Sequence, residues 1–173
     1  VEFVQYNRLH IITNKGFKMN FIFDLDHTVI DSSHRQLTRP DGSLDLDAWR
    51  DNCTAEMISR DKLLPLAKVM RSVFANGHTV IICTARVMSP DDIAFLKANN
   101  LRYNALLSRA DGDNTPDAQL KKALLFWHFK HIPVARWAKR TVFFDDNQSV
   151  LDMADQLGII TRNAIKLNQK LGA

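Results

Sequence analysis

The sequence contains few cysteines and no long apolar run. Its two cysteines, Cys53 and Cys83, lie 30 positions apart without a partner-like spacing, and Cys83 falls in an apolar run typical of a buried thiol. No stretch approaches the roughly 18 apolar residues of a membrane span. Residues 1–18 lack the continuous apolar centre of a secretory signal. We therefore expect a cytoplasmic protein in a reducing environment, with no membrane partner.

A large excess of one charge is also missing. The 173 residues include 23 Lys and Arg against 19 Asp and Glu, which gives a formal net charge of +4. This mild basic excess tolerates a polyanionic partner without indicating one. The apolar fraction of 46% and the charged fraction of 24% are ordinary for a globular protein, and the length suits one domain with a substantial core.

Short apolar runs alternate with segments of helical character. Runs rich in β-branched and aromatic residues, without polar alternation, are typical of parallel strands buried on both faces. Four such runs are residues 21–23, 79–83, 105–107 and 141–144, and residues 158–161 are a candidate fifth. Helices are expected over residues 61–76, 90–99, 116–131 and 149–157. The alternation predicts an α/β fold, a Rossmann-like parallel sheet with helices on both faces.

Residues 31–60 interrupt this alternation. They contain a turn signal, Pro40-Asp41-Gly42-Ser43, and scattered apolar residues that include Trp49. We predict a small insert or cap after the first strand, within a domain that spans residues 19–173. Residues 1–18 are expected to be a peripheral N-terminal extension without a catalytic role, and a strand at residues 9–13 is the alternative.

The strongest chemical signal is Asp24-Leu25-Asp26, at the C-terminal end of the first apolar run. That end of a parallel strand faces the ligand crevice of an open α/β sheet. If the strand opens into a loop after Asp24, both carboxylates can face one ligand. One then serves as nucleophile or metal ligand while the other transfers protons. The alternative is a pair of strand-end acids that cap a loop.

A second acidic pair, Asp145-Asp146, follows the fourth run. Adjacent carboxylates repel one another unless a cation lies between them, and Mg²⁺ prefers such hard oxygen ligands. The alternative is that one of the two acids caps the helix that begins near Ser149.

A hydroxyl side chain and several cationic side chains complete the candidate site. Thr84 and Arg86 follow the second run, where a hydroxyl, backbone N–H groups and a guanidinium form the parts of a phosphate cradle. Lys121 and Lys122 lie in a predicted helix. Taken alone, Thr84 is an ordinary strand-end hydroxyl and the cations are surface charges; in this order, one lysine is a candidate cation between phosphate and nucleophile.

Together these segments resemble the haloacid dehalogenase superfamily of phosphatases, over residues 20 to about 161. The four motifs of that superfamily occur in order, as Asp24, Asp26 and Thr28, then Thr84, then Lys121 or Lys122, then Asp145 and Asp146. His27 stands where glycine is common, which affects the loop rather than the carboxylates.

A narrower resemblance links residues 107–121 to the 3′-phosphatase domain of phage polynucleotide kinase–phosphatases. There an arginine and a Gly-Asp pair precede the third-motif lysine, as Arg109, Gly112-Asp113 and Lys121 do here, and this spacing selects Lys121 over Lys122. The chain contains no Gly-x-x-x-x-Gly-Lys-Ser/Thr, so the kinase half of those proteins is missing.

The resemblance implies a Mg²⁺-dependent phosphatase. Asp24 would form an aspartyl-phosphate and Asp26 would act as acid and base. Thr84 and Lys121 would bind the phosphoryl group, with Arg86 and Arg109 as further substrate contacts. The implied metal ligands are Asp24, the backbone carbonyl of Asp26, Asp145 and Asp146.

The expected substrates are phosphorylated nucleic-acid ends, above all 3′-phosphates. A 5′- or 3′-nucleotidase or other small-molecule phosphatase is the alternative. A receiver-like phosphoacceptor domain is disfavoured, because its adjacent acids come first in the sequence rather than last. Trp49 could stack on a base, but we favour the interpretation that it anchors the insert. The resemblance also suggests a separate kinase or ligase as a partner, and the host cytoplasm as location if a phage encodes the chain.

Overall fold

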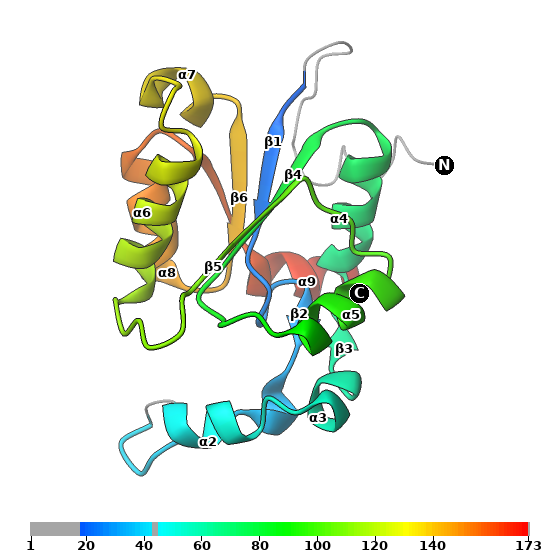
Figure 1. The fold of residues 1–173 in the computed structure, drawn as a ribbon. Coiled ribbons are helices and arrows are strands. Elements are labelled where there is room, and N and C mark those ends of the chain that lie inside the picture. The colour runs from blue at the N-terminus through cyan, green and yellow to red at the C-terminus, as the bar shows by residue number, and fades with distance from the viewer. Residues whose placement is uncertain (1–17, 43–44, 173) are drawn as a thin grey trace.

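Five parallel strands form the central sheet of the computed structural model, which describes residues 18–42 and 45–172 (Figure 1). Their order is β5-β4-β1-β6-β7, so β1 lies in the middle. In the register of the sheet, Phe23 at the end of β1 is opposite Ile82 of β4 and Phe144 of β6. The three strands that precede the predicted site residues therefore end side by side. The strands are β1 (Asn20–Phe23), β4 (Thr79–Thr84), β5 (Ala105–Ser108), β6 (Thr141–Asp145) and β7 (Ile160–Asn163).

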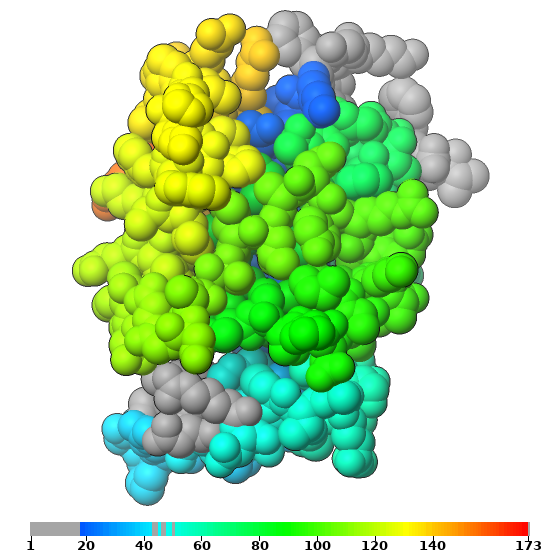
Figure 2. Space-filling view, viewed as in Figure 1, coloured from blue at the N-terminus to red at the C-terminus, as the bar shows by residue number. Residues whose placement is uncertain are grey.

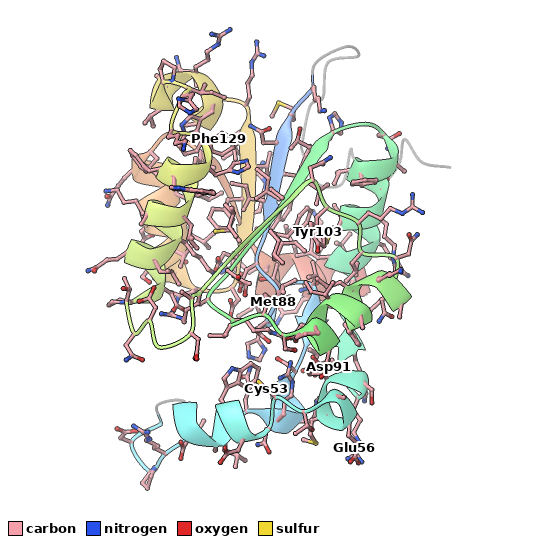
Figure 3. The ribbon with its side chains drawn as sticks, in the orientation of Figure 1. Cys53, Glu56, Met88, Asp91, Tyr103 and Phe129 are labelled. Atoms are coloured by element: carbon pink, nitrogen blue, oxygen red, sulfur yellow. The ribbon has the colours of Figure 1, made fainter. Side chains whose placement is uncertain are left out.

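Helices cover both faces of the sheet, which is why the strands are apolar on both sides. Phe21 and Phe23 pack toward one face and Ile22 toward the other, as the alternation of a strand requires. The first face is covered by α4 (Leu66–Ala75), α5 (Pro90–Ala98) and α9 (Ala164–Gly172). The second is covered by α6 (Asp117–His128), α7 (Val134–Ala138) and α8 (Gln148–Gln156). Tyr103 and Phe129 mark these two layers in Figure 3. The predicted α/β fold is confirmed.

Helix boundaries follow local capping chemistry. Ser89 caps α5 in a reciprocal capping box with Asp92, and Pro90 is the first helical residue, as predicted. Asn147 caps α8 by accepting a hydrogen bond from the Ser149 N–H, so the alternative in which an acid of the adjacent pair caps this helix is wrong.

Other boundaries differ from the prediction. α4 begins at Leu66 instead of residue 61, because Lys62–Leu63 form strand β3 and Pro65 has no N–H for a helix interior. α6 ends at His128, before a Pro133 that starts the separate helix α7. The sequence patterns did not predict α7, α9 or the small two-stranded sheet.

Residues 31–60, called the insert below, form a lobe at the C-terminal ends of the strands (Figures 1 and 2). Strands β2 (Ile30–Asp31) and β3 (Lys62–Leu63) pair antiparallel, so the two ends of the insert leave the body side by side. Between them lie a 3₁₀ turn, Ser33–Arg35, and helices α2 (Leu46–Asp51) and α3 (Ala55–Ser59). Among the described residues, no helix is long and apolar enough to cross a membrane. The predicted extension at residues 1–18, with its alternative strand, lies outside the described residues except for Lys18.

Candidate active site

The chain turns sharply as soon as it leaves β1. The Leu25 carbonyl accepts hydrogen bonds from the N–H groups of Thr28, Val29 and Ile30, at 3.2, 3.0 and 2.9 Å. Within this turn His27 has a φ of 55°, the left-handed conformation for which glycine is usual and which histidine adopts more readily than most residues. Leu25 is buried in the core, so the two flanking carboxyls, Asp24 and Asp26, both border the cavity. The strand opens after Asp24, as the chemistry requires.

Asp24 meets the second acidic pair across the end of the sheet. Carboxylate oxygens of Asp24, Asp145 and Asp146 all lie within 4.8 Å of one another. The ammonium of Lys121 lies 2.7 Å from Asp145 Oδ2 and 3.1 Å from Asp24 Oδ1. Asp24 Oδ1 is buried and makes no hydrogen bond among the described residues. Three close carboxylates, one of them with a buried oxygen that accepts no hydrogen bond, fit a hard divalent cation such as Mg²⁺.

Burial determines the protonation of this cluster. It raises the pKa of Asp24 from 3.8 to about 8; the Lys121 ammonium opposes this shift and the Asp145 carboxylate adds to it. The pKa of Asp146 is also raised, first by burial and then by the Asp145 charge. A cation bound among these oxygens would favour their ionised forms.

A cavity of about 590 Å³ opens above the cluster and is lined by Thr84 and Lys121. The Thr84 hydroxyl oxygen accepts the Arg86 backbone N–H at 3.2 Å, which leaves the Thr84 O–H able to donate. Lys121 is only 1% exposed, whereas Lys122 faces solvent. The structure therefore brings Thr84 and Lys121 together with Asp24, and leaves Lys122 outside.

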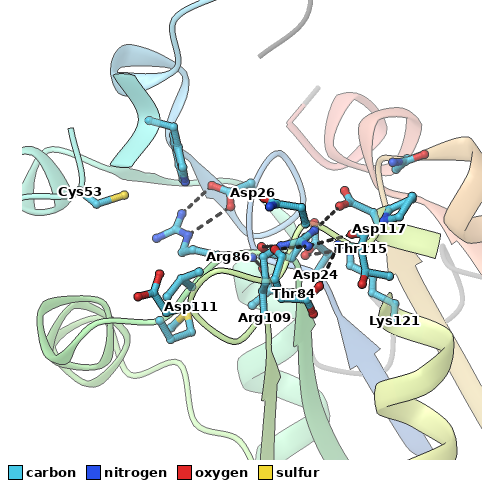
Figure 4. A pocket seen from close by; sticks show the side chains of 18 of the residues that line it. Asp24, Asp26, Cys53, Thr84, Arg86, Arg109, Asp111, Thr115, Asp117 and Lys121 are labelled. Carbon is cyan, nitrogen blue, oxygen red and sulfur yellow. Dashed lines mark hydrogen bonds and ion pairs between the residues drawn. The ribbon is translucent and has the colours of Figure 1, made fainter. Parts of the chain in front are cut away.

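Asp26 is held on the other side of the cavity by Arg86 (Figure 4). Nε of Arg86 donates to Asp26 Oδ2 at 3.1 Å, Nη2 donates to Oδ1, and the Ser32 hydroxyl donates to the same Oδ1. Burial alone would raise the pKa of Asp26, but the Arg86 charge, its hydrogen bonds and that of Ser32 bring the pKa below its ordinary value. The Asp26 side chain lies outside the three-carboxylate cluster, so a metal-ligand role for this residue would fall to its backbone carbonyl.

Arg109 lines the cavity, and its guanidinium binds the loop that leads into α6. Nε donates to the Ala85 carbonyl at 2.7 Å, and Nη1 donates to the carbonyls of Asp113 and Thr115 at 3.0 and 2.8 Å. Nη2 pairs with the Asp117 carboxylate at 2.8 Å. These contacts join the loop after β4 to the loop after β5; the predicted substrate contact of Arg109 stays a prediction.

The insert closes one side of the cavity. The ring of Trp49 lies over the guanidinium of Arg35, 4.4 Å from its carbon to the ring centroid, and 5.7 Å from that of Arg86. Such cation–π contacts favour the anchoring interpretation of Trp49, which also lines the cavity. Cys53 lies on the side of the insert that faces the body, and Glu56 on the far side (Figure 3).

Sequence reasoning missed the buried charges behind Arg86. Asp92 accepts from Arg86 Nη1 at 2.6 Å, and Asp61 accepts two hydrogen bonds from Arg35 at 3.0 and 2.9 Å. In the sequence, Asp92 belongs to the N-terminal signal of the helix expected at residues 90–99, and Asp61 to the start of the helix expected at residues 61–76. Asn147, also missed, lines the cavity beside Asp146.

The fold is that of haloacid dehalogenase-type hydrolases. A haloacid dehalogenase-like hydrolase from Streptococcus pneumoniae superposes with a TM-score of 0.58 at 12% identity, covering 88% of this chain and 91% of that one. One chain of the Pnkp1/Rnl/Hen1 complex superposes with a TM-score of 0.64 at 21% identity, covering 88% of this chain and 47% of that one. The predicted resemblance to this superfamily is confirmed for the fold.

Within that class, residues 11–173 match the family described as bacteriophage T5 5′-deoxynucleotidase, and the chain belongs to this family. The 5′-deoxynucleotidase of Escherichia phage T5 is 42% identical over 85 residues. This match spans 47% of the chain and 35% of the phage protein, so the chain covers well under two thirds of that relative.

Proposed function

We propose that the chain is a Mg²⁺-dependent phosphomonoesterase that removes the 5′-phosphate of deoxynucleoside monophosphates through an aspartyl-phosphate. The observation that carries the chemistry is that Asp24 and the Asp145-Asp146 pair, at the ends of the neighbouring strands β1 and β6, converge with Lys121 of α6. A nucleophilic carboxylate needs a nearby cation to approach an anionic phosphate. The Lys121 ammonium is one such cation, and the three carboxylates leave a place for a metal ion as the second.

In the first step, a carboxylate oxygen of Asp24 attacks phosphorus while the bond from phosphorus to the leaving oxygen breaks. Asp26 must be protonated for this step, which its pairing with Arg86 in the free chain opposes. Asp26 therefore turns from Arg86 toward the leaving oxygen and gives a proton to the departing alkoxide, which leaves as the alcohol. A water molecule then attacks phosphorus, Asp26 takes a proton from it, and Asp24 is released as a carboxylate with inorganic phosphate. Thr84 and Lys121 donate hydrogen bonds to the phosphoryl oxygens throughout.

The metal would be held by the carboxylates of Asp24, Asp145 and Asp146 and by the backbone carbonyl of Asp26. When bound, Mg²⁺ supplies positive charge that offsets the repulsion between the carboxylate and the phosphate.

Family membership over residues 11–173 favours free 5′-deoxynucleotides over the 3′-ends that the sequence motifs favoured. The cavity of about 590 Å³ lies within the 300–1,000 Å³ that small-molecule sites occupy. Removal of 3′-phosphates from polynucleotides, beside a separate kinase or ligase, is the second candidate. It is supported by residues 107–121 and by the likeness to a chain of an RNA repair complex.

A phosphate-release panel tests both proposals. Purified chain with Mg²⁺ would be given deoxynucleoside 5′-monophosphates, the corresponding 3′-monophosphates, and 3′-phosphorylated oligonucleotides, each repeated in EDTA. We expect kcat/KM to be highest for the 5′-monophosphates and to vanish in EDTA. A preference for 3′-phosphorylated oligonucleotides would replace the first candidate with the second, and activity that is unchanged in EDTA would contradict the metal assignment.

A further inference from the structure

Five charged side chains form one buried cluster between the body and the insert. Asp26 follows β1, Arg86 follows β4, and Asp92 lies in α5. Arg35 lies in the insert, and Asp61 directly follows it. The Asp26 side chain is 20% exposed and the other four are at most 1% exposed. Asp26 and Arg86 both line the substrate cavity, and Asp26 is the more exposed of the two.

Arg86 is held at both ends of its guanidinium. Nε and Nη2 form a side-on pair with Asp26, and Nη1 donates to Asp92 Oδ1 at 2.6 Å. Asp61 Oδ2 lies 3.7 Å from the same Nη1. When Asp26 turns toward a leaving group, Arg86 is still neutralised by Asp92 and keeps its place. Without Asp92, that charge would rest on Asp26 and the more distant Asp61.

Asp92 performs two tasks through two different oxygens. Oδ1 binds Arg86, whereas Oδ2 accepts from the backbone N–H and the hydroxyl of Ser89, at 2.9 and 2.8 Å. The capping contacts of α5 use Oδ2, which leaves Oδ1 for Arg86. A capping residue needs only the Ser89 contacts, so the contact with Arg86 calls for a second explanation.

We propose that Asp92 is a positioning residue for catalysis, which anchors Arg86 so that Arg86 aligns the carboxyl of Asp26 with the oxygen of the leaving group. This inference rests on the proposed function, in which Asp26 transfers the proton. It predicts a defect in leaving-group protonation rather than in phosphate binding or in folding.

The leaving group separates these possibilities. A nucleotide releases an alkoxide that needs a proton, whereas p-nitrophenyl phosphate releases a stable phenolate that does not. For Asp92→Asn we expect kcat on a deoxynucleoside 5′-monophosphate to fall at least about tenfold, which is part of the 10²–10⁴-fold that general acid–base catalysis contributes. We expect kcat on p-nitrophenyl phosphate to fall several-fold less than kcat on the nucleotide, because only the water step still needs Asp26 there, and KM to change little for both.

Two control variants match this change. Asp91→Asn removes the same charge from the same turn of α5 at an exposed position, and Ser89→Ala removes the cap while leaving Arg86 its partner. Both are expected to keep the wild-type ratio of nucleotide to p-nitrophenyl phosphate activity, even if Ser89→Ala lowers the melting temperature. An unchanged ratio in Asp92→Asn would overturn the inference, as would the same shift in Ser89→Ala.

A double variant keeps the test decisive if Asp92→Asn does not fold. Arg86→Gln combined with Asp92→Asn buries no unpaired charge at these two positions. If Asp92 acts through Arg86, adding Asp92→Asn to Arg86→Gln leaves the activity ratio unchanged. A further drop in the ratio would overturn the proposal. Wild-type protein inactive on both substrates would instead contradict the proposed function, which keeps the two failures distinct.

Discussion

The Lys121 ammonium donates a 2.7 Å hydrogen bond to Asp145 Oδ2, and the same nitrogen lies 3.1 Å from Asp24 Oδ1. A helix on one face of the sheet thereby places a buried cation between the ends of β1 and β6. The contact ties the stability of the fold to the proposed chemistry, since each carboxylate depends on this charge.

Lys121→Met should therefore reduce both stability and turnover. Loss of the cation leaves two buried carboxylates without their partner, and breaking a buried pair costs about 3–5 kcal/mol. Urea unfolding and steady-state kinetics would measure the two effects. The matched control is Lys122→Met at the exposed neighbour, which should change the free energy of unfolding by less than about 0.5 kcal/mol. Equal effects of both substitutions would contradict the assignment of Lys121.

Asp24→Asn should abolish turnover while leaving the chain folded. Loss of a catalytic nucleophile reduces kcat on the order of 10⁴-fold or more, because the amide cannot form the aspartyl-phosphate. Nucleotide hydrolysis by the purified variant would measure this loss, and retention of full activity would remove Asp24 from the mechanism. Asp155→Asn, an exposed acid on α8, is the control and should retain wild-type kcat.

Metal binding offers a readout that does not depend on activity. Mg²⁺ should raise the melting temperature of the wild-type chain, since a ligand that binds only the folded state stabilises it. Asp145→Asn removes one of the three clustered carboxylates, so the shift produced by Mg²⁺ should shrink or disappear. Differential scanning fluorimetry with Mg²⁺ or EDTA would report the shift. An undiminished shift in this variant would place the metal elsewhere.

Without metal, the chain should lose stability as pH rises. The pKa of Asp24 is about 8 in the folded chain and 3.8 as a free side chain, so between these values the folded state binds more protons. Stability from this group is fully present below pH 4 and is lost as pH rises through 8. The raised pKa values of Asp145 and Asp146 act in the same direction. Urea unfolding in EDTA at pH 6 and pH 9 should show the decline.

Asp24→Asn provides the control for this pH dependence. Because asparagine does not ionise, the variant should lose less stability between pH 6 and pH 9 than the wild type, and it should be the more stable of the two at pH 9. If wild type and variant declined equally, the dominant titrating group would lie outside Asp24.

The parts of this site that the sequence could predict are those fixed by the strand ends. Asp24, Thr84 and Asp145 each end or follow an apolar run, and a parallel sheet brings the same ends of its strands together. The fifth strand was also predicted, although it extends to Asn163 rather than residue 161. Local patterns of this kind need no knowledge of distant contacts.

The buried charges could not be found in this way. Arg86 and Asp26 are 60 positions apart and meet where the segments after β4 and β1 lie side by side. Arg35 and Asp61 are 26 positions apart, and their pairing depends on how the insert folds. Nor does sequence spacing distinguish a paired buried arginine from a surface one. The late start of α4 has a similar cause, since Lys62–Leu63 pair with a strand more than thirty positions earlier in the chain.

Arg109 is expected to hold the loop that leads into α6. Its guanidinium makes hydrogen bonds to three backbone carbonyls and pairs with Asp117. Lysine would keep the positive charge but could not reproduce this planar set of contacts. If Arg109 serves to hold the loop, Arg109→Lys and Arg109→Gln should impair kcat/KM to a similar degree, and both should make residues 109–117 more sensitive to limited proteolysis.

A direct electrostatic contact with phosphate gives the opposite pattern. Arg109→Lys would then retain most of the affinity for substrate while Arg109→Gln would lose it, and the loop would resist proteolysis in both. Kinetics on a nucleotide, combined with limited proteolysis by an endoproteinase that cleaves at aspartate, would separate the two roles. The loop contains Asp111, Asp113 and Asp117, and substitution of Arg109 removes none of these cleavage sites. If Arg109 holds the loop, its hydrogen bond to the Ala85 carbonyl also fixes the residue before Arg86. Loss of this bond should then weaken proton transfer by Asp26. We therefore expect the nucleotide activity of both variants to fall further than their p-nitrophenyl phosphate activity.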